Sequence, residues 1–337
     1  MTAVAWVRTF LAGLLSAAWA IACAAQGTAA AVCHHDEATR PALARLREAL
    51  ATDRFITYEP IAIKVINGQV TSADAASIRA DLTVLRSRFD ALITYDAVHG
   101  AQQIPGIAAA LGYRALIIGV WNPFDDAETQ AALAAARAYP KLVVGVSFGN
   151  ELLFGRRTNA ARLGARLAEL HKREPGLLLS TSEPFHIYRE PAGEPVLGQL
   201  DFLLPNVHPV FQPWFQGAPT ANSAQFVVNV VEELAARFCG PILVKETGVP
   251  TAPPGPNFNE GAQADFYAAL RQRFSPGRER AFAYFAAFDA PWRALDMTPT
   301  GPARTEEAFW GLYDVQRRPK PAARALALLP TSPPVPP

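Results

Sequence analysis

The strongest constraint on the fold of this chain is a regular alternation of short apolar segments with longer helical patterns. Eight segments are rich in β-branched and other apolar residues and have the length of strands. They lie at 56–63, 91–95, 115–120, 142–148, 177–182, 202–207, 242–245 and 281–287. Helical patterns, several of which begin near Ser or Asp, fall between them at 72–89, 125–138, 158–172, 221–238 and 260–274.

This alternation predicts a parallel sheet, because a crossover connection must separate one parallel strand from the next. The segments are apolar throughout rather than at every second position, which is typical of strands covered on both faces. Eight such strands fit a closed barrel better than an open sheet. We therefore predict an α/β protein built as a single (β/α)8 TIM barrel.

The two ends of the chain are expected to lie outside this domain. Arg8 precedes an uncharged, Ala-rich stretch that ends in small residues near Ala30, which predicts a secretory signal over residues 1–31 and a secreted or periplasmic protein. A retained membrane anchor and lipidation at Cys23 are the alternatives. Residues 32–328 contain no linker and form the predicted domain, and the Pro-rich residues 329–337 predict a disordered tail.

Composition excludes several classes of function. Half of the 337 residues are apolar and the formal net charge is +1, which argues against a disordered chain and against a nucleic-acid partner. We expect a monomer without a cofactor, which meets a membrane only if its N-terminus stays uncleaved or is lipidated. After signal removal Cys33 and Cys239 remain, and these could pair in an oxidising compartment or stay as two separate thiols.

Two glutamates directly follow predicted strands. The segment 143–148 leads to Gly149-Asn150-Glu151, and the segment 242–244 leads to Lys245-Glu246. The carboxyl ends of barrel strands meet at one rim, where catalytic groups collect. A pair of carboxyls in one cleft suits glycosidic-bond cleavage with retention, in which one is a protonated acid/base and the other an ionised nucleophile. We assign Glu151 as the acid/base and Glu246 as the nucleophile, with Asn150 bonding the sugar 2-hydroxyl.

Other polar and aromatic side chains fall at the same strand ends. Aromatic rings can stack on sugar faces, and polar groups can bond sugar hydroxyls. The aromatic residues could equally be core residues, and the polar ones could belong to structural networks. The predicted substrate-binding residues are Asn150, Tyr95, Trp121, Glu183, His208, Phe211, Trp214, Asp289, Trp292 and Glu307.

Three rival patterns are weaker. Gly145-Val146-Ser147-Phe148-Gly149 fits the nucleophile elbow of serine hydrolases, but no histidine follows late in the chain, since the last one is His208. His34-His35-Asp36 could bind a metal but is expected to be a solvated terminus. Asp96 and His99 lack a third ligand nearby, so no metal site is predicted.

Several motifs in one order resemble glycoside hydrolase family 17, the β-1,3-glucanases and related glucan-remodelling enzymes. The resemblance extends over about residues 55–314. It implies a barrel whose acid/base follows strand four and whose nucleophile follows strand seven, in agreement with the assignment above. The motifs are Gly149-Asn150-Glu151, Asn206-Val207-His208-Pro209, Val244-Lys245-Glu246-Thr247-Gly248, Ala287-Phe288-Asp289-Ala290-Pro291-Trp292 and Trp310-Gly311-Leu312.

The chain departs from the family pattern in the strand-eight motif and after the nucleophile. The family's usual glutamate and lysine are Ala290 and Arg293 here, and Val249 replaces a tryptophan, whereas Glu307 matches a glutamate near the family's cleft. We therefore predict an exported retaining glycosidase acting on β-glucan, with β-1,3-glucan as the expected substrate. A β-glucan transglycosylase with the same residues, or a non-catalytic glucan-binding barrel, is the alternative.

Overall fold

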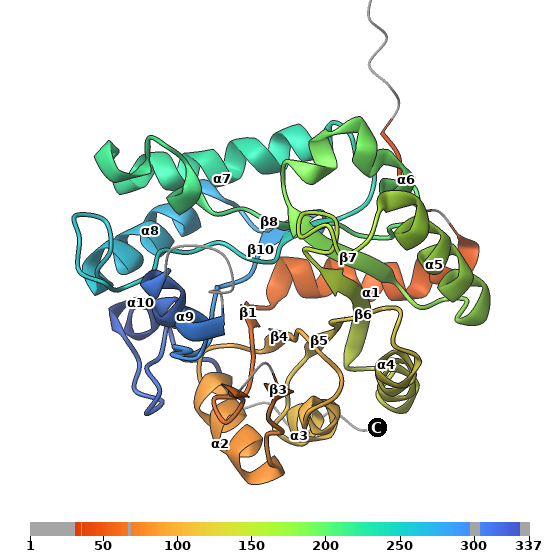
Figure 1. The fold of residues 1–337 in the computed structure, drawn as a ribbon, viewed down its shortest axis with the longest axis horizontal. Coiled ribbons are helices and arrows are strands. Elements are labelled where there is room, and N and C mark those ends of the chain that lie inside the picture. The colour runs from red at the N-terminus through yellow and green to blue at the C-terminus, as the bar shows by residue number, and fades with distance from the viewer. Residues whose placement is uncertain (1–30, 35, 67–68, 297–303, 331–337) are drawn as a thin grey trace, which may run out of the picture. The chain divides into compact units, whose positions relative to one another are not determined.

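A curled arrangement of parallel strands with helices outside it forms the centre of the protein in a computed structural model (Figure 1). The structure describes residues 31–34, 36–66, 69–296 and 304–330, all within the compact unit Ala31–Pro337. The predicted signal segment, Cys23 and residues 331–337 of the predicted tail lie outside the described residues. Leu329, the first residue of that tail, donates its backbone N–H to the Ser87 carbonyl at 2.9 Å.

All eight predicted strand positions contain a strand, although most of the strands are shorter than predicted. Six of them form one parallel sheet in the order β1-β4-β5-β6-β7-β8, and β9 pairs in parallel with β10. Strands β2 and β3 form a separate antiparallel pair that the sequence did not predict. The strands are β1 Phe55–Thr57, β2 Val65–Ile66, β3 Gln69–Val70, β4 Ala91–Ile93, β5 Ala115–Val120, β6 Val143–Asn150, β7 Leu179–Pro184, β8 Leu204–Asn206, β9 Ile242–Val244 and β10 Arg280–Phe282.

Isolated parallel bridges join the two sheets. Leu203 pairs with Ile242 and Asn206 with Glu246 between the β8 and β9 segments, while Ile56 pairs with Tyr284 between β1 and the residues after β10. The parallel sheet is therefore strongly curled. The predicted strand 56–63 ends early because Pro60 has no N–H to donate to a neighbouring strand.

Helices follow most of the strands. The five predicted helical patterns are confirmed as α2, α4, α5, α7 and α8, whereas α1 and α3 had not been predicted. Short 3-10 turns occur at 37–39, 101–103, 187–189, 191–193, 209–211, 215–217 and 305–309. The α-helices are α1 Arg40–Thr52, α2 Ala75–Arg86, α3 Ile104–Ala110, α4 Asp126–Ala138, α5 Ala160–Arg173, α6 Glu194–Leu197, α7 Thr220–Ala235, α8 Glu260–Arg273, α9 Arg293–Asp296 and α10 Pro321–Arg324.

Side-chain caps fix where several of these helices begin. The carboxylate of Asp74 accepts the N–H of Ser77 at the start of α2, and Asn159 and Asn259 cap α5 and α8 in the same way. Each cap gives an otherwise unpaired backbone N–H a partner and is worth about 1 kcal/mol of helix stability.

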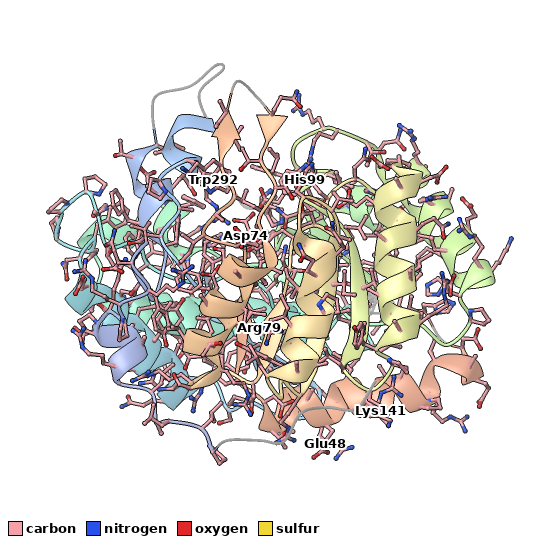
Figure 2. All side chains as sticks on the ribbon, turned by 90° about the horizontal axis from the view of Figure 1, so that it is seen from below. Glu48, Asp74, Arg79, His99, Lys141 and Trp292 are labelled. Carbon is pink, nitrogen blue, oxygen red and sulfur yellow. A yellow bond between two sulfur atoms is a disulfide. The ribbon has the colours of Figure 1, made fainter. Side chains whose placement is uncertain are left out.

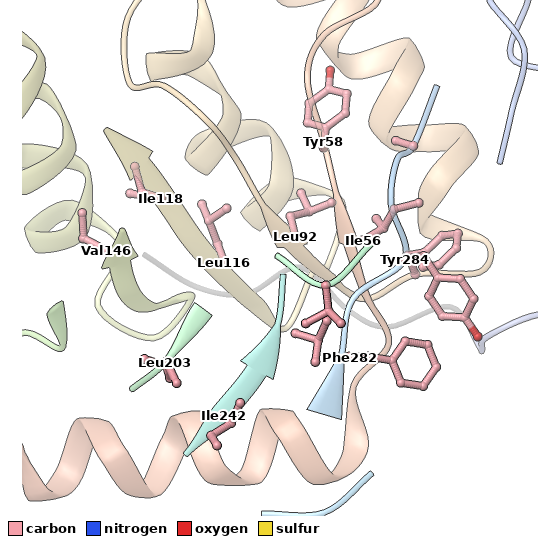
Figure 3. Packing of buried hydrophobic residues seen from close by; sticks show 14 of the residues in the cluster. Ile56, Tyr58, Leu92, Leu116, Ile118, Val146, Leu203, Ile242, Phe282 and Tyr284 are labelled. Carbon is pink, nitrogen blue, oxygen red and sulfur yellow. The ribbon is translucent and has the colours of Figure 1, made fainter. Parts of the chain in front are cut away.

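The strands are buried on both faces, which explains their uninterrupted apolar sequences. Phe55 belongs to an inner cluster that α1 completes with Leu46 and Leu50, whereas the next residue, Ile56, belongs to a larger cluster that includes residues of the outer helices. Figure 3 shows the second cluster, in which Ile56 and Leu92 extend from neighbouring strands. Alternate residues of a strand thus enter two apolar environments, as its pleat requires.

An N-terminal strap, residues 32–34, is attached beside the starts of β8 and β9. Val32 forms a parallel bridge with Phe238, and Cys33 forms a disulfide with Cys239 across a sequence separation of 206 residues. The pairing that the sequence left open is therefore present. Figure 2 shows Trp292 and His99, which follow strands, at one end of the unit, and Glu48 and Lys141 at the opposite end.

Candidate active site

Glu151 is positioned by a sharp change of direction at the end of β6. Gly149 has φ +104°, and a Cβ there would lie 2.4 Å from Cδ1 of Leu152, so only glycine fits. Glu151 itself is left-handed, with φ +53°, and its N–H donates to the Ser182 carbonyl of β7 at 2.7 Å. The strained backbone and the bond to β7 together aim the Glu151 side chain.

Glu246 is held immediately beyond β9. Its carbonyl accepts the N–H of Val207 at 2.7 Å, which fixes its backbone to the segment after β8. Its Oε1 accepts the Tyr95 hydroxyl at 2.9 Å, and its Oε2 lies 3.4 Å from Nε2 of His208. Burial and the charge of Glu246 raise the pKa of Tyr95, so this hydroxyl keeps its proton and donates it.

Lys245 completes the surroundings of Glu246 and was missed as a site residue. Its buried Nζ donates to Oδ1 of Asn150 at 2.5 Å and lies 3.4 Å from Oε1 of Glu246. It also lies 4.1 Å from the centre of the Tyr95 ring. The signal was present in the sequence as an apolar strand that ends in adjacent basic and acidic residues.

These contacts favour the ionised form of Glu246. Burial alone would raise the pKa of this carboxyl, because it disfavours the charge. The Lys245 ammonium and His208, with a further contribution from Arg293, outweigh burial and lower the pKa to about 2. Glu246 is therefore a carboxylate throughout the neutral and mildly acidic range.

Glu151 has the opposite tendency. Burial raises the pKa of Glu151, and the negative charge of Glu246 raises it further. Nδ2 of Asn206 donates to Oε1 of Glu151 at 2.9 Å and partly offsets this rise. Asn206 is oriented in turn by the Ser182 hydroxyl, which donates to its Oδ1 at 2.9 Å. Two carboxyls with pKa values driven apart suit one proton donor and one nucleophile.

Exposed aromatic rings surround this pair. Trp121 and Phe211 are 45% and 48% exposed, which is unusual for rings of this size and leaves part of each ring open to a sugar. The Arg157 guanidinium lies 4.7 Å from the Trp121 ring centre, and that of Arg304 lies 4.4 Å from Phe211. Trp214 is also partly exposed and packs edge-on against Phe226.

A sequence model of the BtgE/BtgC glycoside hydrolase domain matches residues 56–311. The chain belongs to this family. It is therefore a glycosidase, and the predicted resemblance is confirmed at the level of a family 17-like enzyme.

Three relatives agree with this assignment. A glucan 1,3-beta-glucosidase of Arthroderma benhamiae is 24% identical over 263 residues, covering 73% of this chain and 84% of that protein. An active-site mutant of the Rhizomucor miehei beta-1,3-glucanosyltransferase in complex with laminaritriose is 21% identical, with a TM-score of 0.62 over 81% of this chain and 97% of that chain. An endo-laminarinase from Formosa is 17% identical, with a TM-score of 0.61 over 78% and 83% of the two chains. At these identities the two structures establish the shared α/β fold.

Three predicted substrate residues of this glycosidase have hydrogen-bond partners within the protein. Glu183 is fully buried, and its oxygens accept the N–H groups of Leu153 and Phe154, as a buried carboxylate requires. Asp289 accepts from Nζ of Lys320 at 2.7 Å, and Glu307 accepts from the Trp310 indole at 3.1 Å; both are partly exposed. Sequence position alone did not reveal these partners.

Asn150 and Trp292 have neighbours that contact Glu246. The side-chain oxygen of Asn150 accepts a hydrogen bond from Lys245 in the absence of sugar. Trp292 lines a pocket together with Tyr95, Glu59 and Arg293. Glu59 forms an ion pair with Arg293, and neither residue had been predicted for the site. Glu59, in the segment after β1, is thus the negative partner of Arg293. Position 290, where the family usually has a glutamate, carries alanine.

The rival patterns do not form competing sites. Ser147 is buried within β6 with its hydroxyl 3.4 Å from the Gly149 carbonyl, so it is not an exposed nucleophile on a turn. His34 had been expected to be solvated but bonds Asp201 through Nδ1 at 2.9 Å. His35 lies outside the described residues.

His34, His171 and Asp201 have ligand atoms within 4.8 Å of one another, close enough for a metal ion. However, the two imidazole rings stack with centres 3.7 Å apart and planes 16° apart. A metal bound to a ring nitrogen lies near the plane of that ring, and two stacked planes offer no common position. The cluster also lies at the strand starts, at the opposite end from Glu246. Within the described ranges, no helix is both long enough and apolar enough to cross a membrane.

Proposed function

We propose that this glycosidase cleaves β-1,3-glucan with retention of configuration, with Glu246 as nucleophile and Glu151 as acid/base. The observation that carries the proposal is the opposed electrostatic environment of the two carboxyls. Tyr95, Lys245 and His208 contact Glu246, whereas Glu151 is half-buried beside a negative charge. These surroundings favour the ionised form of Glu246 and the protonated form of Glu151, as double displacement requires.

In the first step, Glu246 attacks the anomeric carbon while the bond from that carbon to the leaving oxygen breaks. Glu151 gives its proton to this oxygen, and a glycosyl ester on Glu246 results. In the second step, Glu151 removes a proton from the acceptor, whose oxygen attacks the anomeric carbon and releases Glu246. Both steps use the same two carboxyls and restore their original protonation.

The β-1,3-glucan substrate is supported by the glucosidase relative and by the glucanosyltransferase that binds laminaritriose. Exposed Trp121 and Phe211 offer stacking surfaces for such a chain. If the acceptor is water the enzyme hydrolyses, and if it is a sugar hydroxyl the enzyme transfers. We infer a hydrolase, with transfer as the second candidate because one relative is a glucanosyltransferase.

We also infer that the curled sheet closes into a complete (β/α)8 barrel. The bridges Ile56–Tyr284 and Leu203–Ile242 support closure, as does the inner cluster to which residues from around the sheet contribute. Export is part of the same proposal. The N-terminal sequence supports it, and so does the Cys33–Cys239 disulfide, since disulfides persist mainly in oxidising compartments.

The test is incubation with reduced β-1,3-gluco-oligosaccharides, followed by mass analysis of the products. Wild type should give shorter products, and longer ones in addition if it transfers. Glu246→Gln should abolish both, and Glu151→Gln should lower the rate by about 10²–10⁴-fold, the usual contribution of a general acid. Glu279→Gln, which alters an exposed glutamate paired with Arg47, is the matched control and should behave as wild type. Wild-type inactivity on β-glucans would leave only a binding role.

A further inference from the structure

One buried carboxylate next to the proposed acid/base has no role in the two chemical steps. Glu183 has no exposed surface, and its Oε1 and Oε2 accept the N–H groups of Leu153 and Phe154 at 2.8 and 3.1 Å. Both donors belong to the loop 151–157, which begins with Glu151. A fully buried carboxylate that binds only a loop backbone is costly to desolvate, so its contacts with the loop must compensate.

The loop depends on β7 for its position. Ser182 accepts the N–H of Glu151 through its carbonyl at 2.7 Å, and the next residue, Glu183, accepts the following amides through its side chain. The remaining backbone bonds are internal to the loop, for example from Gly155 N–H to the Glu151 carbonyl at 2.9 Å. Two successive residues of one strand therefore fix a segment that starts from a strained, left-handed glutamate.

The charge of Glu151 in turn acts on Glu183. Burial raises the pKa of Glu183 to about 7, the backbone bonds from Leu153 and Phe154 oppose this, and the charge of Glu151 raises it further. The charged groups that act on Glu151 are Glu246, His208 and Lys245, and Glu151 also interacts with Arg157.

We propose that Glu183 is a positioning residue for Glu151, holding the acid/base loop to β7. The inference rests on the proposed role of Glu151. It replaces the substrate contact that the sequence suggested for Glu183.

The chain contains a matched control on the neighbouring loop. Glu128 of α4 is buried and accepts the N–H groups of Trp121 and Asn122 at 2.6 and 2.9 Å. It thus holds the loop after β5 in the way that Glu183 holds the loop after β6. Its oxygens accept N–H groups of Ala97, Trp121 and Asn122 rather than of the loop 151–157.

The experiment compares pH–rate profiles of wild type, Glu183→Gln, Glu183→Asp and Glu128→Gln on β-1,3-gluco-oligosaccharides. Glu183→Gln keeps the shape but offers an N–H₂ group where a backbone N–H needs an acceptor. We expect kcat to fall about 10- to 100-fold with little change in KM, the scale of a misplaced catalytic group.

Glu183→Asp keeps the carboxyl but cannot reach both amides, so kcat should fall with it as well. Glu128→Gln should act on KM rather than on kcat, because the loop that Glu128 holds carries Trp121 and not Glu151. Thermal unfolding of each variant shows whether it is folded. A folded Glu183→Gln with kcat within twofold of wild type, or with a loss that lies in KM rather than in kcat, would overturn the inference. An inactive wild type, or an active Glu151→Gln with an unchanged profile, would instead refute the proposed function.

Discussion

At the scale of single residues, the site is defined by what surrounds each of two glutamates. Glu246 and Glu151 are chemically identical, yet Lys245 and His208 draw the pKa of the first down, while burial and the charge of Glu246 raise that of the second. The identity of a residue therefore does not decide its role in a paired site. The neighbouring charges decide it.

The role of Lys245 can be tested through the acid limb of the pH–rate profile. Lys245→Met removes the ammonium 3.4 Å from Oε1 of Glu246. The carboxylate loses its main favourable charge, so the pKa of Glu246 should rise and the acid limb of kcat/KM should move to higher pH. kcat should also fall, since Asn150 loses its donor.

Lys320→Met is the matched control, because it removes another buried ammonium, bound to Asp289 rather than to Glu246. Its acid limb should coincide with that of wild type. If Lys245→Met leaves the acid limb where it was, then the ammonium does not keep Glu246 ionised.

At the scale of elements, the strap formed by residues 32–34 joins parts of the chain that are distant in sequence. The Cys33–Cys239 disulfide closes a loop over 206 residues, and the strap adds a bridge between Val32 and Phe238. A cross-link over so long a loop restricts the unfolded chain strongly. The strap lies by the strand starts, at the end of the sheet opposite Glu246.

Removal of this cross-link should therefore lower stability and spare catalysis. We expect Cys33→Ser/Cys239→Ser to lose about 3–5 kcal/mol of unfolding free energy. The melting temperature should fall by about 2–4 °C per kcal/mol, while kcat well below the transition stays as in wild type. Reductant should lower the melting temperature of wild type and leave that of the variant unchanged; equal melting temperatures for oxidised wild type and variant would contradict the prediction.

At the scale of the whole molecule, many carboxyls are buried as the fold forms. Burial raises the pKa of Asp53 and Asp96 to about 6 and that of Glu183 to about 7. A carboxyl with a raised folded pKa binds more protons in the folded state than in the unfolded state. Its stabilisation is present at low pH and is lost as pH rises through the folded pKa.

The melting temperature should therefore decline as pH is raised from 5 to 8. Glu246 acts in the opposite direction, because its pKa falls to about 2, so stability should also decline as pH drops from 4.5 toward 2. Circular dichroism melts between pH 3 and 9 test both slopes. The alkaline decline should be shallower in Glu183→Gln, and a melting temperature that rises from pH 5 to 8 would show that these carboxyls are not stabilised in their protonated forms.

Much of this protein follows from its sequence alone. The eight apolar segments predicted the positions of the parallel strands, because strands buried on both faces must be apolar throughout. The predicted parallel sheet also implied that the two strand-end glutamates share one rim, because parallel strands all point their carboxyl ends in one direction. Helices α1 and α3 were missed, and their positions depend on what they cover rather than on a strong pattern of their own.

Only the tertiary structure decided which polar side chains face the cleft and which hold the loops. Glu183 and Glu151 look alike in sequence, since each ends a strand and precedes a loop, yet one carboxylate is bound by backbone amides and the other by Asn206. Lys245 bonds Asn150 across 95 positions, Asn206 bonds Glu151 across 55, and Arg293 pairs with Glu59 across 234. The disulfide joins residues 206 positions apart. A hydrogen bond or ion pair forms over a few ångströms of space, so local sequence does not predict it.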